Sequence, residues 1–176
     1  MTSASDGSDA GAGAKPRTAR GGSAERIFLV VIDATEEHRK ALRFASLRAR
    51  NTGGRVALLY VIEPAEFKHW MAVEDIMRQE RREEAETLLH EVSADVQELS
   101  GKTPVYFLRE GDLADELMKV INEERSISVL VLAAASGKAG PGPLVSALAG
   151  KASGSLPVPL TLVPGDLTDE EIDALT

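Results

Sequence analysis

Two segments carry groups that could bind a phosphorylated ligand. Asp33 directly follows the apolar run Ile27–Ile32, and a loop of residues 136–143 (Ser-Gly-Lys-Ala-Gly-Pro-Gly-Pro) follows the apolar run Val129–Leu132. A carboxylate can accept hydrogen bonds from hydroxyl or amine groups of a ligand, and backbone N–H groups of a glycine loop that leads into a helix can hold phosphate oxygens. A glycine loop after a strand is equally typical of a tight turn without a ligand, so both interpretations stay open at this point.

Two prolines limit the donors that this loop can offer, because Pro141 and Pro143 have no N–H. A phosphate cradle would use the amides of Gly140, Gly142, Leu144 and Val145. Pro143 also suits the first position of a helix, where its missing donor costs little. Gly140-Pro141-Gly142 begins like a dinucleotide-binding fingerprint, but its third glycine position is a valine, which argues against a Rossmann dehydrogenase.

Other catalytic and metal-binding chemistry lacks support in the sequence. Cysteine is absent, and His38, His69 and His90 fall on different predicted elements without the spacing of metal ligands. Ser153 lacks the nucleophile-elbow pattern. The tripeptide Gly101-Lys102-Thr103 resembles the end of a P-loop but runs from a helix into a strand, which is the wrong order. We therefore expect no metal site and no enzyme.

Composition and charge exclude further classes. The chain has 20 Lys and Arg residues and 28 Asp and Glu residues, for a net charge of -8. Broad binding to nucleic acid or to anionic lipid is disfavoured, since both need a positive face. No apolar run approaches the roughly 18 residues of a spanning helix, and the lack of cysteine suits a reducing compartment. We expect a cytoplasmic protein that contacts neither nucleic acid nor membrane.

Apolar runs that alternate with helical periodicity must position these groups. Strands are predicted at Ile27–Ile32, Val56–Ile62, Val105–Leu108, Val129–Leu132 and Pro157–Val163. Helices are predicted over residues 36–51, 66–99 and 144–149, and from residues 112 and 168 onward. Gly53 supplies a left-handed stop for the first of them. This order predicts a three-layer α/β/α fold with a five-stranded, mainly parallel sheet. Such sheets bind ligands at the carboxyl ends of strands, which here are Asp33, the Val61 region and Ala133 onward.

Both ends of the chain differ from this central domain, which we assign to residues 25–165. Residues 1–24 are mostly Gly, Ala, Ser and Asp and offer almost no apolar surface to bury, which predicts a disordered tail. Pro157 and Pro159 lack ladder donors and place the last strand at a sheet edge. Thr168 and Glu171 form a capping-box pattern for a short helix within residues 166–176. That helix presents Leu167, Ile172 and Leu175, which need a partner surface.

Three segments within residues 26–164 resemble the universal stress protein family. Val-Val-Ile-Asp33-Ala-Thr-Glu, followed by Ala41-Leu42 and Ala45, is similar to the family's opening strand, Asp-Gly-Ser-like turn and Ala-Leu-x-x-Ala helix. Val56–Pro64 is similar to its second strand. Residues 111–163 carry a Gly-led helix, a buried strand, a glycine loop and a final Pro-Val-Pro-Leu-Thr-Leu-Val strand.

ATP-binding members of this family carry Gly, two residues, Gly, nine residues, Gly and then Ser or Thr. Gly137, Gly140 and Gly150 reproduce that spacing, whereas Lys151 stands where the hydroxyl residue belongs and could supply a positive charge. The family's first glycine usually ends the fourth strand, a place that Ala133 takes here. This chain therefore departs from the family pattern at two positions.

The resemblance implies an adenine nucleotide as ligand, with ATP as the leading candidate and Mg²⁺ bound only together with the nucleotide. Asp33 and Val61 would contact the adenosine part, Val61 through its backbone. The loop of residues 137–142, together with Gly150 and Lys151, would meet the phosphates. The resemblance also implies a homodimer paired through the last strand, which would cover that open edge.

We thus expect a dimeric stress-response protein that binds an adenine nucleotide as a regulatory ligand, without efficient catalysis. The alternative is a dimeric interaction module of the same fold that binds no nucleotide. Slow nucleotide hydrolysis is a third hypothesis.

Overall fold

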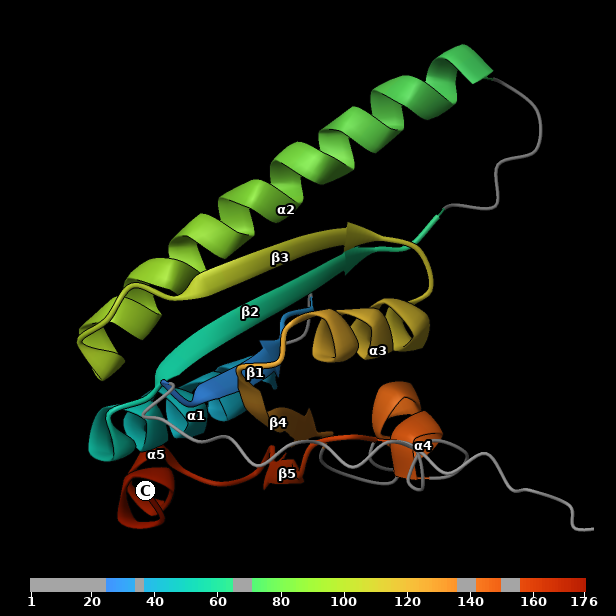
Figure 1. Cartoon of the computed structure of the whole chain (residues 1–176). Coiled ribbons are helices and arrows are strands. Elements are labelled where there is room, and N and C mark those ends of the chain that lie inside the picture. The colour runs from blue at the N-terminus through green and yellow to red at the C-terminus, as the bar shows by residue number, and fades with distance from the viewer. Residues whose placement is uncertain (1–24, 34–36, 65–70, 136–141, 150–155) are drawn as a thin grey trace, which may run out of the picture.

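The sheet of this protein is wholly parallel. The computed structural model describes residues 25–33, 37–64, 71–135, 142–149 and 156–176. Its strands are β1 (Ile27–Val31), β2 (Arg55–Ile62), β3 (Val105–Glu110), β4 (Ile127–Ala134) and β5 (Leu160–Pro164). They form one sheet in the order β3-β2-β1-β4-β5, and each neighbouring pair is parallel. The predicted five-stranded sheet is confirmed (Figure 1).

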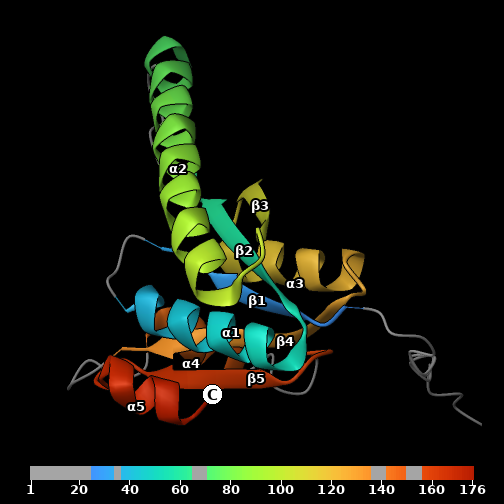
Figure 2. The same ribbon diagram turned by 90° about the vertical axis from the view of Figure 1, so that its left-hand side faces the viewer.

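Helices cover both faces of this sheet. They are α1 (His38–Thr52), α2 (Met71–Ser100), α3 (Leu113–Glu123), α4 (Pro143–Ala149) and α5 (Asp169–Ala174). Figure 2 shows α1, α2 and α5 on one side of the sheet and α3 on the other. Along β1, Phe28 and Val30 pack with buried residues of α1, α2 and α5, whereas Leu29 and Val31 pack with those of α3 and α4. The alternation follows from the period of two along a strand, and it gives the predicted three layers.

Local sequence signals set several helix ends. Gly53 ends α1 with a φ of 70°, a left-handed conformation that glycine adopts without a steric penalty. Asp112 begins α3 by accepting a hydrogen bond from the backbone N–H of Asp115. Thr168 and Glu171 exchange both hydrogen bonds of a capping box at the start of α5. All three ends were predicted from the same residues.

The last two strands differ in extent from the prediction. β5 begins at Leu160, three residues later than predicted, because Pro157 and Pro159 have no N–H for the ladder. Pro159 contributes only its carbonyl, which accepts a hydrogen bond of 2.9 Å from Leu130. β4 is longer than the predicted Val129–Leu132, since its outer residues pair through their backbones whatever their side chains. β5 is an edge strand, as predicted.

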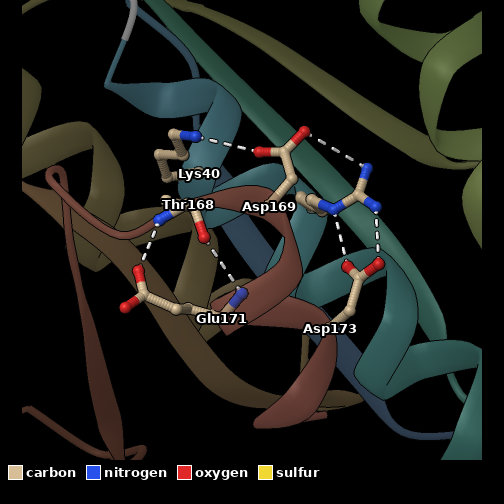
Figure 3. Close-up of polar contacts among 6 residues, drawn as sticks. Lys40, Thr168, Asp169, Glu171 and Asp173 are labelled. Carbon is tan, nitrogen blue, oxygen red and sulfur yellow. Dashed lines mark hydrogen bonds and ion pairs between the residues drawn. The ribbon is translucent and has the colours of Figure 1, made fainter.

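The short helix α5 packs against α1. Ile172 is fully buried in the cluster on the α1 face, and Leu167 packs against the same cluster. Leu175 is 60% exposed, so within one chain only Leu167 and Ile172 have the partner surface that was expected, and a partner for Leu175 stays a prediction. Figure 3 shows Asp169 beside Lys40 of α1, whose Nζ donates a hydrogen bond of 2.9 Å to it. Apolar and ionic contacts therefore hold α5 against α1.

The longest helix, α2, extends past the carboxyl ends of β2 and β3, as Figure 1 shows. Its 30 residues span about 45 Å at 1.5 Å per residue. Side chains at i and i+4 pair along its exposed face, such as Gln79 with Glu83 and Arg82 with Glu86. None of the described helices is both long enough and apolar enough to cross a membrane.

Candidate functional site

A cavity of about 210 Å³ lies where β1 and β4 end. The strand order reverses between these two strands, because the chain runs outward through β2 and β3 on one side and through β5 on the other. Parallel α/β sheets bind ligands at this switch point. The described residues that line the cavity are Val31, Asp33, Glu37, His38, Leu113, Leu132, Ala133, Ala135, Gly142, Pro143, Leu144 and Val145.

Three of the predicted site residues meet in this cavity. Asp33 follows β1, Ala133 lies near the end of β4, and Gly142 directly precedes α4. They are far apart in the sequence, so the parallel sheet brings them together. The predicted residues Gly137, Gly140, Gly150 and Lys151 lie outside the described residues.

Val61 lies on the neighbouring strand and is not among the lining residues. It is paired with Arg109 of β3 and packs against the apolar cluster on the α3 face. The N–H of Ile32 donates a hydrogen bond of 2.8 Å to the carbonyl of Leu59, so Val61 follows at the same edge of the sheet as Asp33. Its contact with a ligand stays a prediction.

The walls of the cavity are apolar and its polar groups are few. Leu113, Leu132, Leu144 and Val145 supply aliphatic surface from α3, β4 and α4. Such walls suit a flat apolar group, with polar side chains to orient it. Among the described residues, no group of three or more His, Asp or Glu side chains is arranged to hold a metal ion.

Gly142 gives the loop its entry into α4. Its φ of 96° lies in the region that side chains disfavour, so glycine is required by conformation. The carbonyl of Gly142 accepts a hydrogen bond of 3.0 Å from Ser146, and Pro143 is the first residue of the helix, as predicted. A Cβ atom on Gly142 would meet no atom of the described residues within 4 Å, so it is the backbone conformation and not a lack of space that requires glycine.

Two functional candidates were not recognised from the sequence, namely Glu37 and His38. Both line the cavity from the start of α1, and His38 is only 8% exposed. The Nδ1 atom of His38 lies 3.6 Å from Oδ1 of Asp33, whose side chain is 53% exposed. The sequence carried a signal for the location of these two residues, because the first turn of a helix after a central strand lies near that strand's carboxyl end, but it carried none for the burial of His38. His38 was interpreted only as a solvated or packing residue.

A larger hollow, of about 670 Å³, lies between α1, α2 and α5. Its charged lining includes Lys40, Arg43 and Asp169, which already bind one another across the helices, together with Asp95 of α2. We favour the smaller cavity as the site, because it lies at the switch point and combines a carboxylate with a buried imidazole.

Comparison with known proteins agrees with this architecture. Universal stress protein UspA from Lactobacillus plantarum matches 81% of this chain and 99% of its own, at 15% identity and a TM-score of 0.67. A universal stress protein in complex with cAMP matches 80% of this chain and 98% of its own, at 15% identity and a TM-score of 0.57. The Archaeoglobus fulgidus universal stress protein in complex with dAMP matches 79% and 97%, at 17% identity and a TM-score of 0.54.

At these identities the solved structures establish the fold alone. No curated protein sequence is similar enough to the chain to count as a relative. The sequence model of the universal stress protein family matches residues 25–164, which include all five strands. The chain therefore belongs to the universal stress protein family.

Proposed function

We propose that this protein binds an adenine nucleotide in the cavity between β1 and β4, with ATP as the leading candidate. The observation that carries the proposal is that Asp33 and Gly142 line one cavity at the switch point of the sheet. A single ligand can therefore reach both the carboxylate after β1 and the end of the glycine loop before α4.

The chemistry of the cavity supports this ligand class. Asp33 can accept hydrogen bonds from ribose hydroxyls, and the aliphatic walls suit a purine base. The loop between β4 and α4, with Gly137 and Gly140, and beyond α4 Gly150 and Lys151, would meet the phosphates and any accompanying Mg²⁺. Two solved structures with the same fold are described as complexes with cAMP and with dAMP, both adenine nucleotides.

A regulatory ligand fits the lining better than a substrate does. None of the described lining residues is Ser, Thr, Cys or Lys, so this part of the wall offers no side-chain nucleophile of those types. We propose that bound nucleotide acts as a signal, in a homodimer paired through the free edge of β5. Slow hydrolysis by water is tested by measuring phosphate release in the binding samples.

Calorimetric titration of the full chain with ATP, AMP and GTP tests the proposal. We expect saturable adenylate binding, weakened at least roughly tenfold by Asp33→Asn because charge-assisted hydrogen bonds are worth about 1.5–3 kcal/mol. Asp95→Asn, in the larger hollow, is the matched control and is expected to bind normally. Mass spectrometry of small molecules released from the purified protein is an independent check.

Two outcomes would overturn the proposal. Absence of adenylate binding at millimolar concentration would favour the interaction module that binds no nucleotide. Binding that Asp95→Asn abolishes and Asp33→Asn spares would move the site to the hollow between α1, α2 and α5.

A further inference from the structure

His38 is a buried imidazole with an unsatisfied nitrogen in the wall of the proposed site. Its Nδ1 atom is shielded from solvent and has no hydrogen-bond partner. Buried polar atoms without a partner are rare and unfavourable, since the atom loses its bonds to water and gains none. The position of His38 in the wall therefore calls for a function.

The nearest acceptor is Asp33. Its Oδ1 atom lies 3.6 Å from Nδ1, which exceeds a hydrogen bond of 2.7–3.2 Å by less than 1 Å. α1 holds His38 in place, because Ala41, Leu42 and Ala45 of that helix are buried in the core. The Asp33 side chain is 53% exposed, so its carboxylate is not enclosed by packed side chains as His38 is. A small movement of the carboxylate would close the gap.

His38 is also the only described lining residue whose side chain can donate a hydrogen bond. Asp33 and Glu37, the other polar side chains of the wall, are acceptors when ionised, and the remaining lining residues are apolar, Gly or Pro. Two neighbouring carboxylates cannot orient each other by hydrogen bonds. Among the described lining side chains, His38 is therefore the one that can orient Asp33 by donating a hydrogen bond.

We propose that His38 is a positioning residue for nucleotide binding: its Nδ1–H donates to Oδ1 of Asp33 and leaves Oδ2 facing the ligand's ribose hydroxyl. This inference rests on the proposed function. Direct contact between ligand and Nδ1 is disfavoured because the atom is shielded from solvent. The proposal requires the neutral imidazole to carry its proton on Nδ1, a tautomer that NMR can identify.

Three variants separate positioning from packing. His38→Leu replaces the imidazole with an apolar side chain of similar size and so removes the donor. We expect this variant to weaken ATP binding roughly tenfold. His38→Asn places an amide donor near Nδ1 and should recover more of the affinity than His38→Leu. His90→Leu, an exposed position on α2, controls for the loss of a histidine. In an Asp33→Ala background, His38→Leu should have no further effect, since its target is gone.

Nitrogen-15 NMR of the His38 ring in the full chain with ATP gives a readout independent of affinity. We expect the Nδ1–H form in the wild type and its loss in Asp33→Ala. Equal affinity of His38→Leu and wild type, additive effects with Asp33→Ala, or a proton on Nε2 alone would overturn the inference while the nucleotide site stands. A wild-type protein that binds no adenylate would overturn both.

Discussion

The guanidinium of Arg43 donates two hydrogen bonds, each of 2.7 Å, to the Asp173 carboxylate, and so joins α1 to α5 (Figure 3). Lys40 and Asp169 form a second link between the same helices. The residues of α5 lie beyond residues 25–164, where the family match ends. This C-terminal helix therefore lies outside the matched family domain, and its contribution to stability can be measured separately.

Burial of Ile172 should account for most of that contribution. We expect Ile172→Ala to lower the free energy of unfolding by about 2–5 kcal/mol, since the fully buried side chain would leave a cavity in the α1 face of the core. Leu175→Ala on the exposed side of the same segment should change it by less than about 0.5 kcal/mol. Urea unfolding of both variants measures the difference. Equal effects would mean that α5 is not held by its apolar side.

The ion pairs of α5 should make its attachment sensitive to acid. The hydrogen bond from Lys40 lowers the pKa of Asp169, and that from Arg43 lowers the pKa of Asp173, both from an ordinary value of 3.8. A lowered folded-state pKa stabilises the protein above the unfolded value, and this contribution is lost as the pH falls below about 4 through the folded values.

Comparing wild type with the Asp169→Asn, Asp173→Asn double variant tests this pH dependence. Asparagine does not titrate, so the difference in unfolding free energy should be present at pH 7 and disappear as the pH falls through the lowered pKa values of the two aspartates. It should also shrink in high salt, because these side chains are exposed and screened. A difference that persists in acid would assign the effect to packing rather than to charge.

Sequence reasoning recovered the fold because its signals are local. The apolar runs gave all five strands, and Gly53, Asp112 and Thr168 gave helix ends whose hydrogen bonds form within a few residues. β5 was placed too early, at Pro157, because an apolar run shows where side chains can be buried and not where N–H groups can pair.

The site was recovered less completely because it depends on contacts between distant segments. Asp33 was predicted from its position at a strand end and Gly142 from the glycine loop after β4, and the structure places both in one cavity. His38 was not, since a lone histidine on a helix gives no sign that its Nδ1 is buried beside Asp33. Only the packing of α1 onto the sheet reveals that relationship.

Gly54 should be intolerant of any side chain for a reason different from that of Gly53. A Cβ atom on Gly54 would lie 2.6 Å from the carbonyl oxygen of Arg26, a backbone atom that cannot move without disturbing β1. We expect Gly54→Ala to cost about 1–3 kcal/mol of stability. Gly53 has open space but a φ of 70°, so Gly53→Asn, which tolerates that conformation, should cost less. Thermal unfolding of the two variants distinguishes steric overlap from backbone strain.

The proposed dimer uses the β5 edge of the sheet and leaves the β3 edge unpaired. Leu130 donates to the carbonyl of Pro159, and Gly165 donates to that of Ala134, so alternate residues of β5 face β4. By this alternation the backbone N–H of Leu162 points away from the sheet, where a second copy could pair with it. Its side chain is 42% exposed.

Leu162→Lys should therefore convert the proposed dimer to a monomer, because the two-fold axis would bring two added charges and two lost apolar contacts together. Tyr106→Lys on β3 at the opposite edge is the matched control, since Tyr106 is 61% exposed and should tolerate the charge. Sedimentation velocity of both variants and the wild type decides between the edges. A monomeric wild type would refute pairing through β5, and dissociation by Tyr106→Lys alone would place the interface at β3.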